Sequence, residues 1–110
     1  MLEAIFGNAT AEKVLLYIES HGEGYAQAIA DTFDDATLRM AQVQLSRFER
    51  GGILQSQLKG RTRLFSWNPR YPFQRELRAL LRKALESLPE ADRKKFFLQR
   101  QRPRRTGKPL

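Results

Sequence analysis

The chain has no cysteine among its 110 residues and one histidine, His21. The absence of cysteine excludes disulfides, thiolate zinc sites and cysteine nucleophiles, and it fits a reducing cytoplasm. His21 precedes Gly22 at a predicted helix end and has no neighbouring metal-ligand types, so we predict that it caps backbone carbonyls. The sequence has no Ser/His/Asp set, glycine-rich phosphate loop or suitably spaced carboxylate pair. We therefore expect neither enzymatic activity nor a bound cofactor or metal.

Long apolar runs are also missing. None approaches the roughly 18 residues that a membrane-spanning helix needs, and the N-terminal residues MLEAIFGN lack the basic start and apolar core of a signal peptide. We expect an intracellular protein that does not enter membranes. A chain of 110 residues, 41% of them hydrophobic, can form one modest core. The expectation is a single domain, which a partner chain could complete.

Basic residues are scarce at the start of the chain and abundant afterwards. Residues 1–36 contain one base, Lys13, and seven acids, a balance of −6, whereas residues 37–110 contain nineteen bases and five acids, a balance of +14. Such an asymmetry predicts one face that repels polyanions and another that attracts them, which is typical of nucleic-acid binding. The other interpretation is that the bases only keep the protein soluble.

Apolar residues recur at helical spacing in the first half of the chain. The predicted helices cover residues 2–6, 10–21, 25–33 and 36–50. Thr10 is expected to cap the helix of 10–21, and Asp35 that of 36–50. The last helix should end at Gly51-Gly52 and bury one narrow face. That face comprises Leu38, Ala41, Leu45 and Phe48.

Two alternating segments, ILQSQL and TRLFSW, predict a β-hairpin joined through Lys59-Gly60-Arg61. A two-residue loop at Gly60-Arg61, with glycine first as a type II′ turn prefers, sets the register. The pairs would be Leu58 with Arg63, Ser56 with Phe65, and Leu54 with Trp67. The tip would then project Lys59, Arg61 and Arg63. Phe65 and Trp67 are expected in the core, although stacking on unpaired bases is an alternative.

After the hairpin, an apolar stripe over residues 73–88 predicts a long C-terminal helix of roughly four turns. We favour a dimer interface over the core for this stripe, because the preceding elements already enclose a small core. The dimerisation residues would be Leu77, Leu80, Leu81, Ala84 and Leu88. Residues 1–88 would form the domain and residues 89–110 a basic extension. Ser87 and Glu90 fit a capping box for a further helix that contains Phe96 and Phe97. The residues beyond Gln101 are expected to form a disordered tail. This basic tail would add nonspecific affinity for DNA.

A helix followed directly by a basic hairpin is typical of a recognition helix and wing. The predicted fold is mainly α with a small β-hairpin: a winged helix-turn-helix with a long C-terminal helix. The helix of 36–50 would enter the major groove and the wing of 59–63 would lie on the backbone or in the minor groove. The expected base contacts are Thr37, Arg39, Met40, Gln42, Val43 and Gln44; the expected phosphate contacts are Arg47, Lys59, Arg61 and Arg63. Asp34 and Asp35 lie near the expected path of a phosphate strand, so they would either lower the affinity for DNA or only cap the helix.

The sequence resembles the ArsR-type winged helix-turn-helix regulators over residues 2–85. It is most similar to a group that opens with a Leu-Phe-Gly-Ser element, here residues 5–8 (IFGN), and closes its wing with Tyr-x-Leu-Asn-Pro, here residues 65–69 (FSWNP). Some members are fused to nucleotidyltransferase domains, for which 110 residues are too few. The resemblance implies a homodimeric prokaryotic transcription factor, commonly a repressor, bound to double-stranded DNA at the nucleoid. Gln42 and Gln44 stand where the family has serine and histidine, and its metal ligands are missing.

Two alternatives belong to other classes of protein. In the first, the domain docks a separate enzyme or toxin through Phe96 and Phe97, and the tail touches nucleic acid without reading it. In the second, the protein binds RNA or chromosomal DNA without sequence preference. Protection of a discrete palindrome would separate sequence-specific regulation from both.

Overall fold

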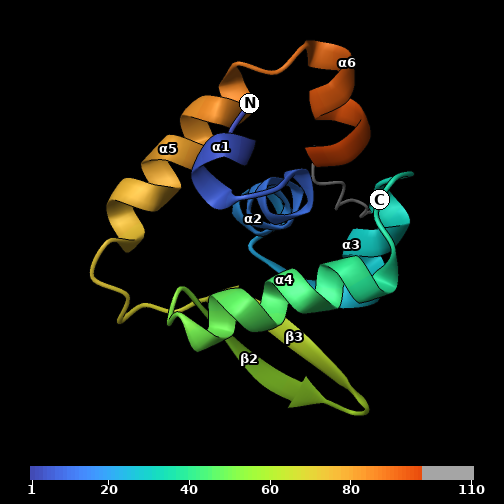
Figure 1. Cartoon of the computed structure of the whole chain (residues 1–110), viewed down its shortest axis with the longest axis vertical. Coiled ribbons are helices and arrows are strands. Elements are labelled where there is room, and N and C mark those ends of the chain that lie inside the picture. The colour runs from blue at the N-terminus through green and yellow to red at the C-terminus, as the bar shows by residue number, and fades with distance from the viewer. Residues whose placement is uncertain (98–110) are drawn as a thin grey trace, which may run out of the picture.

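The computed structural model describes residues 1–97 of the chain, so the predicted disordered tail lies outside the described residues. The fold is mainly helical with a small antiparallel sheet (Figure 1). Its elements are α1 (Glu3–Phe6), α2 (Ala9–His21), β1 (Glu23–Tyr25), α3 (Ala26–Thr32), α4 (Leu38–Arg50), β2 (Leu54–Lys59), β3 (Thr62–Trp67), α5 (Gln74–Glu86), α6 (Glu90–Asp92) and a π-helical turn, η1 (Arg93–Phe97). None of the helices within residues 1–97 is long and apolar enough to cross a membrane.

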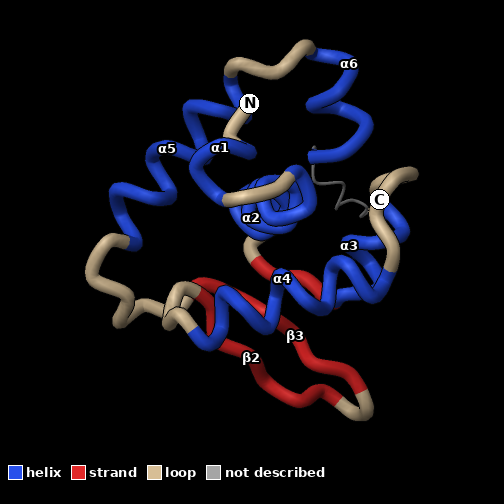
Figure 2. Tube along the Cα trace, viewed as in Figure 1, coloured by secondary structure: helices blue, strands red, loops and turns tan. Residues whose placement is uncertain are grey.

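Helix α2 is the centre of the core. Its residues 14–18 are all buried, which places apolar side chains on more than one of its faces. A helix that is apolar around much of its circumference needs neighbours on several sides. Here α1, α4, α5 and η1 pack around it. Helix α4 lies between this helical part and the hairpin (Figure 2).

The predicted helices are confirmed, but both of the predicted caps are wrong. Asn8, rather than Thr10, caps α2, because its Oδ1 accepts a hydrogen bond of 2.7 Å from the Ala11 backbone N–H. Thr37, rather than Asp35, caps α4 and accepts a bond of 3.1 Å from the Met40 N–H. Each true cap has an extended backbone, which lets its side chain turn back to the free N–H groups of the first turn.

The sheet has a third strand, β1, which the hairpin pattern did not predict. β1 pairs with β3 on the side opposite β2, so the strand order is β1-β3-β2. At three residues, β1 is too short to show an alternating pattern. The hairpin register is confirmed, with Leu54 opposite Trp67 and Lys59 opposite Thr62. Gly60 has φ +64°, the positive value that glycine adopts most easily in such a turn.

Helix α5 is shorter than predicted. It has 13 residues, as many as α2 or α4, so the prediction of a long C-terminal helix is wrong. Ser87 closes α5, its Oγ donating to the Lys83 carbonyl at 2.8 Å, and does not start the next helix as the predicted capping box required. Pro89 occupies the N-cap of α6 without a side-chain bond.

The apolar stripe of α5 packs on α2, and this corrects its assignment as a dimer surface. Leu81 is fully buried and Ala84 is 4% exposed within the single chain, while Leu77 and Leu88 are half-buried against the same core. Leu80 is the predicted dimerisation residue that remains exposed, at 37%, and Phe73 at the start of the stripe is 62% exposed. The prediction failed because α2 has a further apolar face, which the first four helices leave open.

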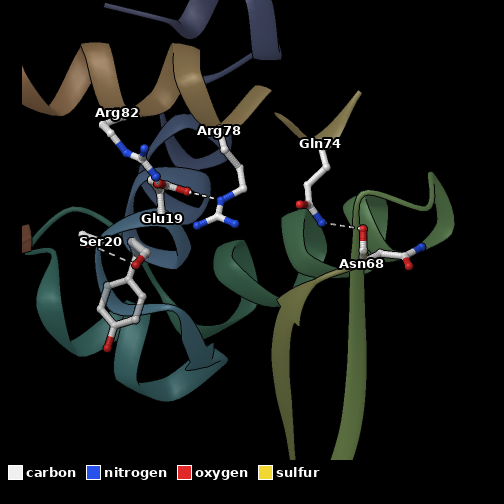
Figure 3. Close-up of polar contacts among 7 residues, drawn as sticks. Glu19, Ser20, Asn68, Gln74, Arg78 and Arg82 are labelled. Carbon is white, nitrogen blue, oxygen red and sulfur yellow. Dashed lines mark hydrogen bonds and ion pairs between the residues drawn. The ribbon is translucent and has the colours of Figure 1, made fainter. Parts of the chain in front are cut away.

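Three polar contacts fix α5 in place (Figure 3). The Glu19 carboxylate of α2, whose side chain is 3% exposed, accepts bonds from Arg78 Nε at 2.8 Å and from Arg82 Nη2 at 2.9 Å. At the start of α5, Gln74 Nε2 donates to the Asn68 carbonyl at 2.9 Å. Helix α5 is thereby joined both to the central helix and to the end of β3.

Candidate nucleic-acid interface

Helix α4 has one buried and one exposed side, as its sequence pattern predicts. Ala41, Leu45 and Phe48 are buried, whereas Leu38, at the start of the helix, is 38% exposed. The helix contacts α3, α2 and β2 through the buried side. Its other side faces solvent and carries long polar side chains together with two exposed apolar ones.

A groove of about 540 Å³ lies between α4, the start of α3 and the hairpin. Arg39 and Gln42 line it from α4, and Arg61 and Arg63 line it from the hairpin tip. The fold therefore brings together cationic side chains that are more than twenty positions apart in the sequence. Three guanidinium groups around one groove make a local positive field that a phosphate backbone would neutralise.

The other predicted base-contacting residues differ in how accessible they are. Met40 and Val43 are 40% and 44% exposed, which leaves their apolar groups available to a partner. Thr37 is exposed, but its hydroxyl oxygen already caps α4. At the hairpin tip, Lys59 is exposed beside Gly60.

Arg47 and Gln44 are held by contacts within the chain. Arg47 donates from Nη2 to the Phe6 carbonyl and from Nη1 to Gln44 Oε1, both at 2.8 Å. Its guanidinium also lies 5.1 Å from the centre of the Phe48 ring. These contacts fasten α4 to the end of α1. The roles of Arg47 at a phosphate and of Gln44 at a base stay predictions. Helical periodicity could not reveal the contact with α1, because Phe6 is 41 residues away.

The structure also adds residues to the groove. Tyr25, Gln27 and Thr62 line it together with Ser46. Tyr25 and Gln27 come from the β1–α3 junction. The pairing of β1 with β3 brings that junction beside the hairpin, and no pattern in the sequence predicted this pairing. Arg63 is steadied by a bond of 3.2 Å from its Nη1 to Ser56 Oγ, and Ser56 in turn donates to Glu49 at 2.7 Å.

The two acids that precede α4 lie away from the groove. Asp35 accepts bonds of 2.6 and 2.7 Å from Lys13 Nζ, and this lysine lowers the pKa of the Asp35 carboxyl. Asp34 and Asp35 line a different hollow, beside α2 and η1. The groove residues include neither, so the expected repulsion of a phosphate strand at this position loses its structural basis.

His21 takes the capping position predicted for it. Its Nδ1 lies 3.1 Å from the Tyr17 carbonyl oxygen and 2.9 Å from Ser20 Oγ. Its ring stacks on Tyr17 at a centroid distance of 3.9 Å, and burial lowers the pKa of the imidazole. Within residues 1–97, no group of three or more His, Cys, Asp or Glu side chains is placed to hold a metal ion.

The aromatic pair near the C-terminal end of the described chain packs inward. Phe97 is 7% exposed, and Phe96 stacks on Phe33 at 5.3 Å between ring centres. Phe33 is the residue that ends α3. Most of the surface that a protein partner was expected to use on Phe96 and Phe97 is therefore covered by the chain itself.

Comparison with known proteins identifies a related fold. No protein-family model and no curated sequence matches the chain. Its structure is similar to the crystal structure of AF1382 from Archaeoglobus fulgidus, with a TM-score of 0.56 over 77% of this chain and 92% of that one. The two sequences are 18% identical, so the likeness concerns the arrangement of helices and strands.

Proposed function

We propose that the protein is a sequence-specific regulator that binds double-stranded DNA through α4 and the β2–β3 hairpin. The observation that carries the proposal is the groove in which Arg39 and Gln42 of α4 lie opposite Arg61 and Arg63 of the hairpin. In this proposal the fold acts as a winged helix-turn-helix. Helices α3 and α4 are its helix-turn-helix, and the hairpin is its wing.

Helix α4 would be the part that reads sequence. The major groove of B-DNA admits one helix, and its base edges distinguish all four base pairs. Arg39 can donate two bonds to guanine and Gln42 can bond adenine in both directions. Met40 and Val43 offer apolar contact to thymine methyl groups, which explains why a solvent face would carry two exposed apolar side chains.

The hairpin tip would hold the backbone. Lys59 and Arg61 flank the turn at Gly60, and both are exposed. Cationic side chains on a short turn supply charge without fixed geometry, so they suit phosphates or a narrow minor groove better than base edges. The wing would therefore contribute affinity and salt dependence, and α4 would contribute discrimination.

A homodimer on a palindromic operator remains part of the proposal, as does repression as the regulatory outcome. Leu81 and Ala84 are buried within the single chain, so the proposed dimer surface lies elsewhere. Exposed apolar side chains remain at Ile5 of α1 and Leu80 of α5, and these are the candidates for a second copy to cover. No cofactor or enzymatic activity is proposed.

The test is a footprint on the DNA upstream of the protein's own gene, repeated at two salt concentrations, with binding measured for two variants. Arg39→Ala should weaken binding to the protected site more than to random DNA, by about 1–3 kcal/mol. Arg61→Ala should weaken binding to both DNAs alike and lower the salt slope by about one.

Arg75→Ala is the matched control, because Arg75 is exposed on α5 and does not line the groove. It should leave the preference for the protected site unchanged. Equal losses on both DNAs for Arg39→Ala and Arg61→Ala would contradict the separate roles of helix and wing. Uniform binding of every duplex, with no protected site, would instead favour a nonspecific nucleic-acid binder.

A further inference from the structure

A second hollow, of about 520 Å³, lies beside α2 and η1. Figure 1 shows α6, the helix before η1, at the end of the molecule opposite the hairpin. The volume of the hollow is within the range of small-molecule sites. Its apolar wall comes from α2, from the end of α3 and from the C-terminal segment of the described chain. The wall consists of Leu16, Phe33, Leu88, Phe96 and Phe97.

Three phenylalanines form an aromatic cluster in this wall. The ring centre of Phe33 lies 5.3 Å from that of Phe96 and 5.6 Å from that of Phe97. Aromatic faces attract cations, and two lysine ammonium groups of the chain lie near rings of this cluster. Lys13 Nζ lies 5.7 Å from the centre of the Phe33 ring, and Lys95 Nζ lies 5.0 Å from that of Phe96.

Carboxylates surround the aromatic cluster. Glu12, Asp34, Asp35 and Asp92 all line the hollow, and the cations among its described lining residues are the Lys13 side chain and the N-terminal ammonium of Met1. Lys13 is already bonded to Asp35, and Glu12 accepts a bond from the Leu2 N–H and lies 3.5 Å from the Met1 ammonium. The side-chain carboxylates of Asp34 and Asp92 have no hydrogen bond or ion pair within residues 1–97. Two exposed carboxylates are therefore left to attract a positive charge.

We propose that this hollow binds a small organic cation that carries an aromatic or branched apolar group. The apolar group would lie against Phe33, Phe96 and Leu88, and the cationic centre would face Asp34 and Asp92. The proposal does not rest on the proposed function, because it concerns a separate surface. The protein has a net charge of +8 and should therefore attract anions over most of its surface. The acidic, aromatic hollow differs from the rest of the surface in attracting cations.

The experiment uses two probes of similar shape and opposite charge, benzyltrimethylammonium and benzylsulfonate, titrated into the full-length protein and followed by amide NMR. The cation should shift the amides of residues 33–35 and 93–97 along a saturable curve. The anion should leave those amides unmoved, although the overall charge of the protein favours it. Equal shifts of these amides by both probes would overturn the proposal.

Variants then test the carboxylates. Asp34→Asn combined with Asp92→Asn should raise the dissociation constant of the cation about fivefold or more, since both groups are exposed and each contributes modestly. Asp31→Asn is the matched control, because Asp31 is an exposed carboxylate of α3 outside the hollow, and it should change nothing. Unchanged affinity in the double variant would contradict the proposed geometry.

The basic residues after position 97 are the competing occupant. A full-length variant with glutamine in place of every base in residues 98–110 should bind the cation with the affinity of the natural chain. If the cation binds only this variant, the hollow belongs to the chain's own basic segment and the proposal fails.

Discussion

At the scale of single residues, the fold depends on side chains whose role is set by distant neighbours. Arg47 and Asp35 were both assigned from their position on a helix, yet each is bonded to a residue more than twenty positions away. Gly24 is constrained instead by a residue closer in the sequence, Tyr17. It is buried in the three-residue strand β1, against the ring of Tyr17.

We predict that Gly24→Ala destabilises the protein by about 1–3 kcal/mol, the usual cost of inserting a methyl group into a packed site. A β-carbon at this position would lie 2.8 Å from Tyr17 Cε1 and 3.1 Å from its Cδ1, closer than atoms in contact allow. Urea unfolding monitored by circular dichroism measures the loss.

Gly51→Ala is the matched control for this substitution. Gly51 has an ordinary helical φ of −79°, and its nearest neighbour would be a backbone oxygen 3.5 Å from the new carbon. Its unfolding midpoint should stay close to that of the natural chain. Equal stability of the two variants would refute the contact argument at Gly24.

At the scale of elements, local patterns in the sequence predicted more than tertiary contacts did. The helices α2, α3 and α4 and the register of β2 with β3 follow from apolar periodicity and from glycine at the turn, because both signals are local. The strand β1 and the packing of α5 on α2 were missed. The first is too short to have a period, and the second depends on how much of α2 the other helices leave uncovered.

For the same reason, only part of the candidate interface could be predicted. Arg39 and Gln42 are exposed on a helix whose buried face is evident, so the opposite face could be inferred. That Arg61 and Arg63 share a groove with them follows from the antiparallel register and the path of the chain after Gly52. The contribution of Tyr25 could not be foreseen, since it requires the pairing of β1 with β3.

A prediction at this scale concerns the attachment of α5. Arg78→Leu should lower the free energy of unfolding by about 1–3 kcal/mol, because the nearly buried Glu19 carboxylate loses one of its two charged donors. Replacing Arg78 and Arg82 together should cost about 3–5 kcal/mol, since the carboxylate is then left without a cation. Chemical denaturation of the single and double variants measures both values.

Arg75→Leu provides the comparison on the same helix, because Arg75 is exposed and makes no ion pair with any residue of 1–97. Its unfolding free energy should differ little from that of the natural chain. If the three arginine variants were equally stable, the Glu19 contacts would have no role in holding α5.

At the scale of the whole molecule, two hollows of similar volume have no lining residue in common. One faces the hairpin, and the other is beside η1. The connection of residues 33–37 contributes Phe33, Asp34 and Asp35 to the second hollow and then leads into the Thr37 cap of α4. A ligand in the second hollow would thus lie against the segment that fixes where α4 begins.

A prediction for the whole molecule concerns the proposed homodimer. Leu80→Glu should shift a homodimer toward monomer and weaken binding to a palindromic site, while the fold is kept because Leu80 is already 37% exposed. Light scattering coupled to gel filtration measures the mass of each species. Ala79→Glu, at an exposed neighbouring position, is the control and should leave the mass unchanged. A natural chain that is monomeric at every concentration tested, and on DNA, would remove the dimer from the proposal.

The third strand has a consequence for how the hairpin can vary. A two-stranded ribbon alone is marginal in water, but β1 pairs with β3 from Glu23 to Tyr25, opposite Leu64 to Ser66, and so fixes the root of the hairpin to the core. The pairs from Leu58 to Arg63 extend beyond that anchorage. Insertions at Gly60 can therefore lengthen or reshape the hairpin tip without disturbing the core. Related proteins with the same fold can thus differ in how far the hairpin extends.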